Sequence, residues 1–236
     1  MTGTLEALLE RRAIRAFDAI PVPPEIREQI LRAAVAAPSS FNSQPYRLIW
    51  IESLAKKTRA AELCLGQSAA KTASVLVVAV ADLGMWKTTG EGQLRWMRKA
   101  GFPEIKIREY ERKAKFAKWF YFQGWFNAFG AVKWAILKAI HPWKVIGMAP
   151  VTKQGLFKWA TKAAALACGN LMVAAEALGW NTCPMEGFDG ERLSEFLGLS
   201  PQTQEIVMVI AVGKKSSAHV DQPQWRRPLE ATVAIL

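Results

Sequence analysis

The sequence predicts an α+β fold in which helices pack on a mixed, mostly antiparallel sheet. The first observation is a set of three strand-like segments, 47–51, 75–80 and 206–212, in which apolar and β-branched residues predominate. The second is that helical patterns separate these segments without the regular alternation that builds a parallel sheet. Because the run at 75–80 is almost continuously apolar, we expect that strand to be buried on both faces.

Two helices are expected before the first strand. Thr4 or Thr2 can cap a helix that ends at about Arg12 and carries leucines on one face. Pro24 suits the first turn of a second helix, and Pro38 ends that helix. The residues after Pro38 therefore form a loop between a helix and a strand.

The C-terminal part predicts one long helix and two short segments before the last strand. Helical patterning returns from Leu156, and residues 163–175 contain no charge, so this helix should be buried on most sides. Residues 183–189 are expected to be a loop, and residues 192–197 a short helix.

Length and composition indicate a globular protein, built as one domain or as one domain with a large insertion. Of the 236 residues, 51% are hydrophobic and 22% are charged, as in folded proteins. The formal charge of +11 is local, because residues 85–165 hold 16 Lys or Arg against four Glu. The rest of the chain holds 15 basic and 16 acidic residues, a net charge of −1. A basic surface that could bind an anionic partner is thus predicted in the middle of the chain.

Cysteine and histidine usage argues against several kinds of site. Cys64, Cys168 and Cys183 are odd in number and lack Cys-x-x-Cys spacing, so neither a disulfide framework nor a zinc site is expected. With two histidines, a histidine-based metal site or catalytic triad is also not expected. The N-terminus does not resemble a secretory signal, and a reducing cytoplasm is the expected location.

A polar loop follows the second helix. Pro38 and a second proline restrict the backbone, while Ser39, Ser40, Asn42 and Gln44 crowd hydrogen-bonding groups into a few residues. Such a loop can hold a polar ligand. The alternative is an ordinary surface turn.

Three segments together resemble the flavin-dependent nitroreductase family. Residues 11–15 read Arg-Arg-Ala-Ile-Arg, where the family has Arg-Arg-Ser-x-Arg. Residues 38–46 read Pro-Ser-Ser-Phe-Asn-Ser-Gln-Pro-Tyr, and residues 184–189 read Pro-Met-Glu-Gly-Phe-Asp; both follow the family's patterns, with Tyr in place of Trp. The likeness covers roughly residues 1–84 and 155–236.

The resemblance implies a three-layer homodimer that binds FMN and takes electrons from NAD(P)H. It also implies ping-pong transfer of two electrons to an electron-poor acceptor such as a nitroaromatic or a quinone. In this family each site lies at the subunit interface, so residues 39–42 should come from the second subunit. The sequence shows neither a Gly-x-Gly-x-x-Gly turn after a strand nor a Walker pattern, so the cofactor must be held in another way.

The arginines are candidates for the anionic parts of the cofactor. Guanidinium groups pair bidentately with phosphate oxygens, which makes Arg11 and Arg12 phosphate or ribityl candidates, with Arg226 and Arg227 as partners. By resemblance Arg15 should reach the N1/O2 edge of the flavin, where a cation stabilises the reduced ring. The alternatives are a solvated helix end and a basic surface tail.

The backbone at Glu186 and Gly187 is, by resemblance, the part of the chain that faces flavin N5, since a glycine allows close approach to a ring system. The alternative is a plain turn in which Gly187 supplies a positive φ. Gln67 falls near the family's polar contact with the ring, although the alignment there is loose. The implied FMN-binding set is Arg11, Arg12, Ala13, Arg15, Pro38, Ser39, Ser40, Asn42, Gln44, Gln67, Pro184, Met185, Glu186, Gly187, Arg226 and Arg227.

The middle segment is rich in lysine and aromatic residues. Residues 119–132 carry no charge and are too few to span a membrane, and seven of the ten tryptophans lie in the basic stretch. Within one nitroreductase-like domain, 1–236, the resemblance leaves residues 85–155 as a helical insertion. We expect this insertion to be a lid over the flavin that supplies Phe120, Phe122 and Trp125 to the substrate. Through residues 113–143 it should also touch an anionic membrane, at the inner membrane face, or a hydrophobic acceptor such as a quinone. The alternative is a lid or dimer arm whose aromatics pack on the partner subunit. Nucleic acid is the least favoured partner.

Two further functions stay open at this point. One is a flavin-binding, membrane-associated protein that keeps the scaffold without turnover. The other is a different reaction on the same scaffold, such as reductive dehalogenation or flavin breakdown.

Overall fold

The computed structural model describes residues 3–122, 124, 128–146, 150–221 and 223–236. The helices are α1 (Thr4–Glu10), α2 (Pro24–Val35), α3 (Leu54–Leu63), α4 (Ser68–Thr72), α5 (Trp86–Lys99), α6 (Glu104–Tyr121), α7 (Ala128–Ile140), α8 (Lys153–Ala177) and α9 (Gly190–Phe196), with short 3₁₀ turns η1 (Ser40–Asn42) and η3 (Leu229–Ala231). The strands are β1 (Phe17–Asp18), β2 (Tyr46–Ile51), β3 (Val75–Asp82), β4 (Asn181–Met185) and β5 (Gln204–Lys215).

The sheet has the order β1-β5-β3-β2, and β4 also pairs with β5. The paired strands run antiparallel, and a single isolated parallel bridge joins Ala13 to Thr182 among the residues that the structure describes. Strand β3 lies between β2 and β5, and each of its residues is buried, as predicted from its apolar run.

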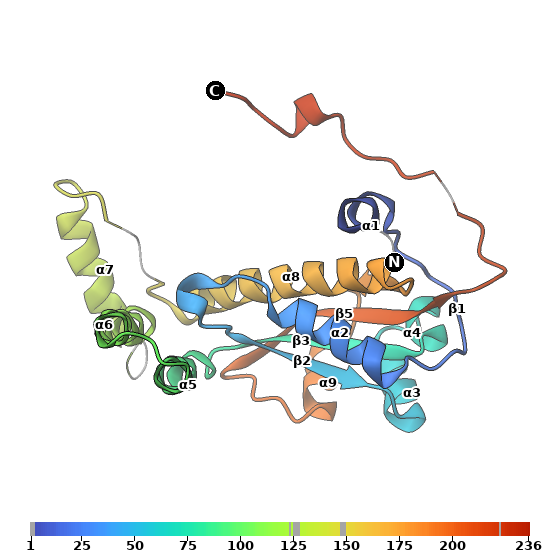
Figure 1. The fold of residues 1–236 in the computed structure, drawn as a ribbon, viewed down its shortest axis with the longest axis horizontal. Helices are drawn as coiled ribbons and strands as arrows, with labels where there is room; N and C mark the ends of the chain where they lie inside the picture. Colours follow the sequence, from blue (N-terminus) through green and yellow to red (C-terminus); the bar gives the residue numbers. More distant parts are fainter. Residues whose placement is uncertain (1–2, 123, 125–127, 147–149, 222) are drawn as a thin grey trace.

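Helices cover both faces of the sheet (Figure 1). On one face, Ile30 of α2 and Leu171 of α8 pack with Val77 of β3. On the other, α3, α4 and α9 contribute to a second cluster in which Leu193 packs with Val78. Side chains alternate along β3, so both layers share one central strand. The predicted three-layer α+β architecture is therefore confirmed.

Several predicted boundaries are wrong for local reasons. Helix α1 ends at Glu10 and not at Arg12, because the chain extends at Arg11 (φ −48°, ψ 129°) on its way to the bridge at Ala13. Residues 183–185 are the end of strand β4 and not a loop. Pro184 obscured this strand, since proline lacks an amide donor and is tolerated mainly near sheet edges.

The long helix α8 is also less enclosed than expected. It buries a stripe of small residues against the sheet and α2, including Ala164, Ala167 and Leu171. Leu166 on another side is 51% exposed in the single chain. The absence of charge from 163–175 therefore marks two apolar faces, of which only one is covered within one protomer.

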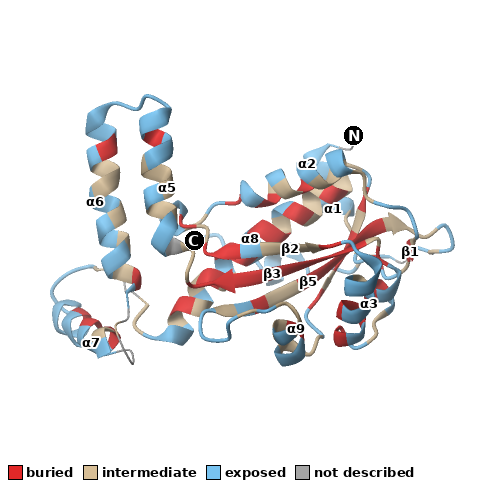
Figure 2. Ribbon diagram, turned by 90° about the horizontal axis from the view of Figure 1, so that it is seen from below, coloured by how far each residue is buried: buried red, intermediate tan, exposed pale blue. Residues whose placement is uncertain are grey.

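Helices α5 and α6 form a hairpin that projects from one end of the sandwich, and α7 packs at its base (Figure 2). These three helices are called the arm below. The arm lies within the predicted helical insertion at 85–155, whose limits stay a prediction. No helix in the described part of the chain is long and apolar enough to cross a bilayer.

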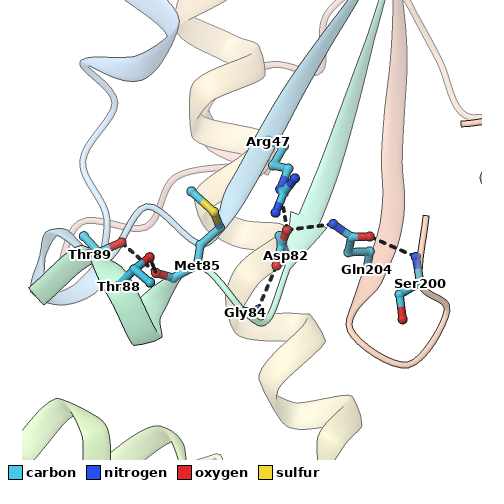
Figure 3. A network of polar contacts seen from close by, with 8 residues as sticks. All are labelled: Arg47, Asp82, Gly84, Met85, Thr88, Thr89, Ser200 and Gln204. Carbon is cyan, nitrogen blue, oxygen red and sulfur yellow. Dashed lines mark hydrogen bonds and ion pairs between the residues drawn. The ribbon is translucent and has the colours of Figure 1, made fainter. Parts of the chain in front are cut away.

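A buried carboxylate anchors the start of the arm to the sheet (Figure 3). Asp82 at the end of β3 is 2% exposed and accepts hydrogen bonds from Gln204 (2.8 Å) and the backbone amide of Gly84 (2.8 Å). The Oδ2 atom, which accepts from Gln204, also forms an ion pair with Nε of Arg47 (2.6 Å). Three segments therefore meet at one side chain, immediately before α5 begins.

We expect Asp82→Ala to lower the free energy of unfolding by about 2–4 kcal/mol, because it leaves buried polar groups without their partner. Denaturant titration measures this loss. A matched control is Glu62→Ala, which removes an exposed ion pair with Arg59 and should change stability by less than about 1 kcal/mol. Equal effects of the two substitutions would contradict the anchoring role of Asp82.

Candidate functional site

The first group of predicted residues lies where α1 leads into the sheet. The amide of Ile14 donates to the carbonyl oxygen of Thr182 (3.0 Å), so residues 11–15 run beside β4. Burial raises the pKa of the nearby Cys183 thiol, and the positive charges of Arg15 and Arg11 act in the opposite direction. This arrangement places two arginines within electrostatic reach of the residues that precede Glu186.

The charges of this group are only partly neutralised. Arg12 donates to the carbonyl oxygen of Glu10 (2.8 Å) and to Oε1 of Gln224 in the C-terminal tail. The guanidinium groups of Arg11 and Arg15 form no ion pair with a carboxylate among the described residues. Two cations therefore remain available for an anionic ligand.

The backbone at Glu186 and Gly187 is held from beneath by Gln67. The Nε2 of Gln67 donates to the carbonyl oxygens of Gly187 (2.6 Å) and Cys64 (3.1 Å). Gly187 is exposed and does not have a positive φ, so the turn itself does not require glycine. A Cβ at this position would lie 3.3 Å from Nε2 of Gln67, which is a tight contact. The alternative that glycine serves the turn geometry is therefore not supported.

The second group is the polar loop, and its backbone is strained. Phe41, Asn42 and Gln44 have φ values of 56°, 49° and 44°, which residues other than glycine adopt at a cost of about 1–3 kcal/mol each. Inside the loop, Oγ of Ser39 accepts from the amide of Gln44 (3.0 Å), and the side chain of Gln44 donates to Oδ1 of Asn42 (3.0 Å). The polar side chains are thus held in a fixed arrangement.

The arm provides the contacts that hold this loop in place. Thr89 of α5 donates to the carbonyl oxygen of Ser43 (3.0 Å), and Gln93 donates to that of Asn42. From α6, the hydroxyl of Tyr121 donates to Oγ of Ser40 (3.2 Å). Any displacement of α5 or α6 must therefore disturb the loop.

A cavity of about 200 Å³ lies between this loop and the hairpin. Its walls include the rings of Phe41, Tyr110 and Tyr121, and Lys113 and Lys118 also line it. Phe41 lies 6.0–6.2 Å, between ring centroids, from Phe116, Phe120 and Tyr121. The cavity is thus aromatic, with two ammonium groups among its lining residues.

Of the three predicted substrate residues, one lies next to the cavity, one is exposed, and one lies outside the described residues. Phe120 packs with Tyr121 at 5.1 Å between ring centroids and also contacts Phe41, next to the cavity. Phe122 is exposed and packs on Phe129 at 5.5 Å. Trp125 lies outside the described residues. Reasoning from the sequence missed Phe41, which occupies the variable position of the polar-loop motif.

One protomer does not bring the two groups together. The polar loop lies beside the arm, whereas residues 11–15 lie at the opposite end of α8 (Figure 1). With 25 residues, α8 is about 37 Å long. Arg226 and Arg227 are exposed on the tail, which leaves the sandwich beyond β5 (Figure 1). Two residues earlier, Gln224 of this tail contacts Arg12 and the carbonyl oxygen of Arg11. The predicted partnership of the basic pair with Arg11 and Arg12 stays a prediction.

The Nitroreductase family model matches residues 8–214. The chain belongs to the nitroreductase family. An NADH dehydrogenase of Thermus thermophilus is 30% identical over 227 residues, which cover 96% of this chain and 93% of that protein. The oxygen-insensitive NAD(P)H nitroreductase of Enterobacter cloacae is 25% identical, with 97% of each chain covered.

Solved structures of nitroreductase-like proteins share this fold. One from Exiguobacterium sibiricum, in complex with FMN, superposes with a TM-score of 0.76 at 22% identity, covering 100% of this chain and 98% of that one. A Bacillus subtilis structure gives a TM-score of 0.77 at 21% identity, with 98% of each chain covered. Membership confirms the family predicted from three motifs, and with it an FMN-dependent oxidoreductase that uses NAD(P)H.

We expect Gln67→Ala to weaken FMN binding about five- to tenfold, because the side chain that links the carbonyl oxygen of Gly187 to that of Cys64 is lost. Fluorescence titration of FMN into the apoprotein measures this change. Gln202→Ala is the control, since Gln202 is exposed and only accepts from Ser200. Unchanged FMN affinity in Gln67→Ala would show that Gln67 does not position the site.

Proposed function

We propose that the protein acts as a homodimeric FMN-dependent NAD(P)H oxidoreductase with two shared sites. Each site takes Arg11, Arg15 and the backbone of Gly187 from one protomer and the polar loop from its partner. The observation that carries this proposal is that two well-formed halves of a binding site lie at opposite ends of α8 in one chain (Figure 1). A two-fold axis can bring such halves together twice.

Exposed apolar side chains support dimerisation. Leu5, Leu8 and Leu9 on α1 are exposed in the single chain, as is Leu166 on α8. The C-terminal tail extends away from the sandwich and exposes further apolar residues, among them Trp225 (Figure 1). Apolar surface of this extent around one helix pair is typical of an interface.

The residues present fit FMN. Arg11 and Arg15 lack carboxylate partners among the described residues, which suits a phosphate and an electron-rich ring edge. The backbone at Gly187 is exposed, and the absence of a Cβ leaves room for the side chain of Gln67 that holds it. Ser39, Ser40, Asn42 and Gln44 supply the polar groups for the sugar chain and the ring edge, with contributions from Pro38, Ala13 and residues 184–186. Arg12 adds positive charge next to Arg11. Arg226 and Arg227 add more where the C-terminal tail of either chain reaches a site.

When bound, FMN supplies the redox chemistry, by accepting a hydride from NAD(P)H and passing electrons to an acceptor. Arg15 holds a positive charge where negative charge develops, and the strained loop presents its donors without rearrangement. The protein contributes no thiolate, because burial raises the pKa of Cys64 and of Cys168 to about 11. Positioning and electrostatics are therefore the chain's share of catalysis.

The acceptor is a planar, electron-poor molecule such as a nitroaromatic or a quinone. The aromatic cavity between the polar loop and the arm supports this choice, because Phe41, Tyr110 and Tyr121 offer ring surfaces for stacking. Lys113 adds positive charge beside the rings, which favours electron-rich oxygens on the acceptor, whereas Lys118 is paired with Glu91.

We expect NAD(P)H to bleach the yellow FMN complex, and a quinone or nitroaromatic to restore the colour. Arg15→Ala should slow flavin reduction about tenfold to a hundredfold, since it removes the charge that stabilises the reduced ring. Stopped-flow absorbance measures both half-reactions. Arg15→Lys should recover part of the rate, and Arg59→Ala, on the exposed face of α3, is the control. Bound flavin that NAD(P)H cannot reduce would identify a binding protein without turnover.

Mixed dimers test the shared site directly. Arg15→Ala damages one half of the site, and Asn42→Gly with Gln44→Gly removes loop side chains while keeping the positive φ values. Co-expression with two different tags yields a mixed dimer with one intact site, so we expect about half of wild-type activity, although each variant alone is impaired.

The control dimer combines a chain carrying all three substitutions with the Asn42→Gly/Gln44→Gly chain. Both of its sites contain a damaged loop, so no activity should return. If the Arg15→Ala and loop variants fail to complement each other, the site is built within one protomer and the proposal is wrong.

A further inference from the structure

Helix α7 is buried along one side and exposes apolar residues around much of the rest of its circumference. Gly130, Lys133 and Leu137 are buried against the rest of the arm. About 90° around the helix from them, Val132, Ile136 and Ile140 are 52%, 47% and 38% exposed, and their spacing of four residues aligns them in one stripe. A helix that is apolar nearly all round is normally covered on both sides. The exposed stripe is therefore an unpartnered surface.

A buried lysine fixes the orientation of this stripe. Lys133 is 1% exposed, and its ammonium group donates to the carbonyl oxygens of Phe120 (2.8 Å) and Pro150 (3.4 Å). It also lies 5.9 Å and 5.7 Å from the ring centroids of Trp119 and Phe129. These contacts tie α7 to the end of α6, so the stripe is held on a solvent-exposed flank of α7 beside this contact.

The charges around the stripe are uniformly positive. From residue 112 to residue 175 the sequence has ten Lys or Arg and no Asp or Glu. The four preceding acids form ion pairs within the α5–α6 hairpin, in the pairs Glu91–Lys118, Glu104–Arg108, Glu109–Lys106 and Glu111–Arg98. The exposed Lys138 and Lys144 therefore have no nearby acidic partner among the described residues.

Tryptophans and an aromatic groove extend the surface. Trp134 is 51% exposed and lies with Lys138 on the other flank of α7, with the exposed Ala131, Ala135 and Ala139 between this flank and the stripe. Trp143, just beyond the end of α7, is 86% exposed. At the junction of α6 and α7, the rings of Trp119, Phe122 and Phe129 line an open groove of about 420 Å³, together with Lys87 and Lys118. Tryptophan and lysine around an apolar stripe are the composition of helices that lie in a membrane interface.

We propose that the arm docks on an anionic lipid bilayer through α7. The exposed side of α7 between its two flanks faces the bilayer. The stripe of Val132, Ile136 and Ile140 enters the headgroup boundary along one flank, Trp134 and Lys138 reach the headgroups along the other, and Trp143 and Lys144 do so just beyond the end of the helix. The arm projects from the end of the sandwich opposite α1 (Figure 1), so this surface is separate from the proposed dimer face at α1. The inference does not rest on the redox function.

Sedimentation with vesicles tests the docking. At low salt, the full-length protein should bind vesicles of equal parts phosphatidylglycerol and phosphatidylcholine and not vesicles of phosphatidylcholine alone. Ile136→Asp with Ile140→Asp should weaken binding at least tenfold, because charge enters the stripe. Lys138→Glu with Lys144→Glu should weaken it at least 25-fold, since each interfacial lysine contributes about fivefold.

The control is Leu54→Asp, which changes an exposed apolar residue on α3, outside the arm. It should leave vesicle binding unchanged, and circular dichroism should show all variants folded. The competing occupant of the stripe is a second copy of the chain. Light scattering of the Ile136→Asp/Ile140→Asp variant tests this alternative by measuring the oligomeric state. A change of oligomeric state in that variant, the absence of binding to anionic vesicles, or an equal loss in Leu54→Asp would each overturn the proposal.

Discussion

The antiparallel pairing of β3 with β5 is the constraint on which the rest of the molecule depends. Both strands are largely buried, and their side chains build the two cores beneath the flanking helices. Strand β5 also carries β4, which delivers the backbone at Glu186 and Gly187. Strand β3 ends at Asp82, from which the arm begins. The two halves of the candidate site are therefore attached to one rigid strand pair.

The arm and the polar loop form one mechanical unit. Hydrogen bonds from Thr89, Gln93 and Tyr121 hold a loop whose positive φ values are unfavourable by themselves. Because the same hairpin lines the aromatic cavity, acceptor binding and loop geometry are linked through α5 and α6. A ligand or surface that moves the arm would consequently act on cofactor binding as well.

Positive charge serves two different purposes in this chain. Near β4, Arg11 and Arg15 are left without carboxylate partners among the described residues, so they can receive an anionic ligand. In the arm, Lys133 is buried, and burial lowers its pKa, yet two carbonyl oxygens and two rings satisfy its ammonium group. Lys138 of α7 and Lys144 just beyond it are exposed and form no ion pair among the described residues, so they can meet an anionic surface.

The sequence by itself determined the fold class, the family and the order of most elements. Unbroken apolar runs identify β3 and β5, and the segments at 11–15, 38–46 and 184–189 identify the family, because local composition and spacing suffice for both. The motifs covered only the two ends of the chain, whereas the family match spans 8–214.

Only the tertiary structure decided how distant segments meet. Proline at position 184 hid strand β4, whose partner β5 lies more than 20 residues away in the chain. Phe41, Tyr110 and Tyr121 come together only because the hairpin packs beside the polar loop, and Lys133 is buried only because α7 folds back on α6. Such contacts depend on packing between elements, which the periodicity of a single segment does not encode.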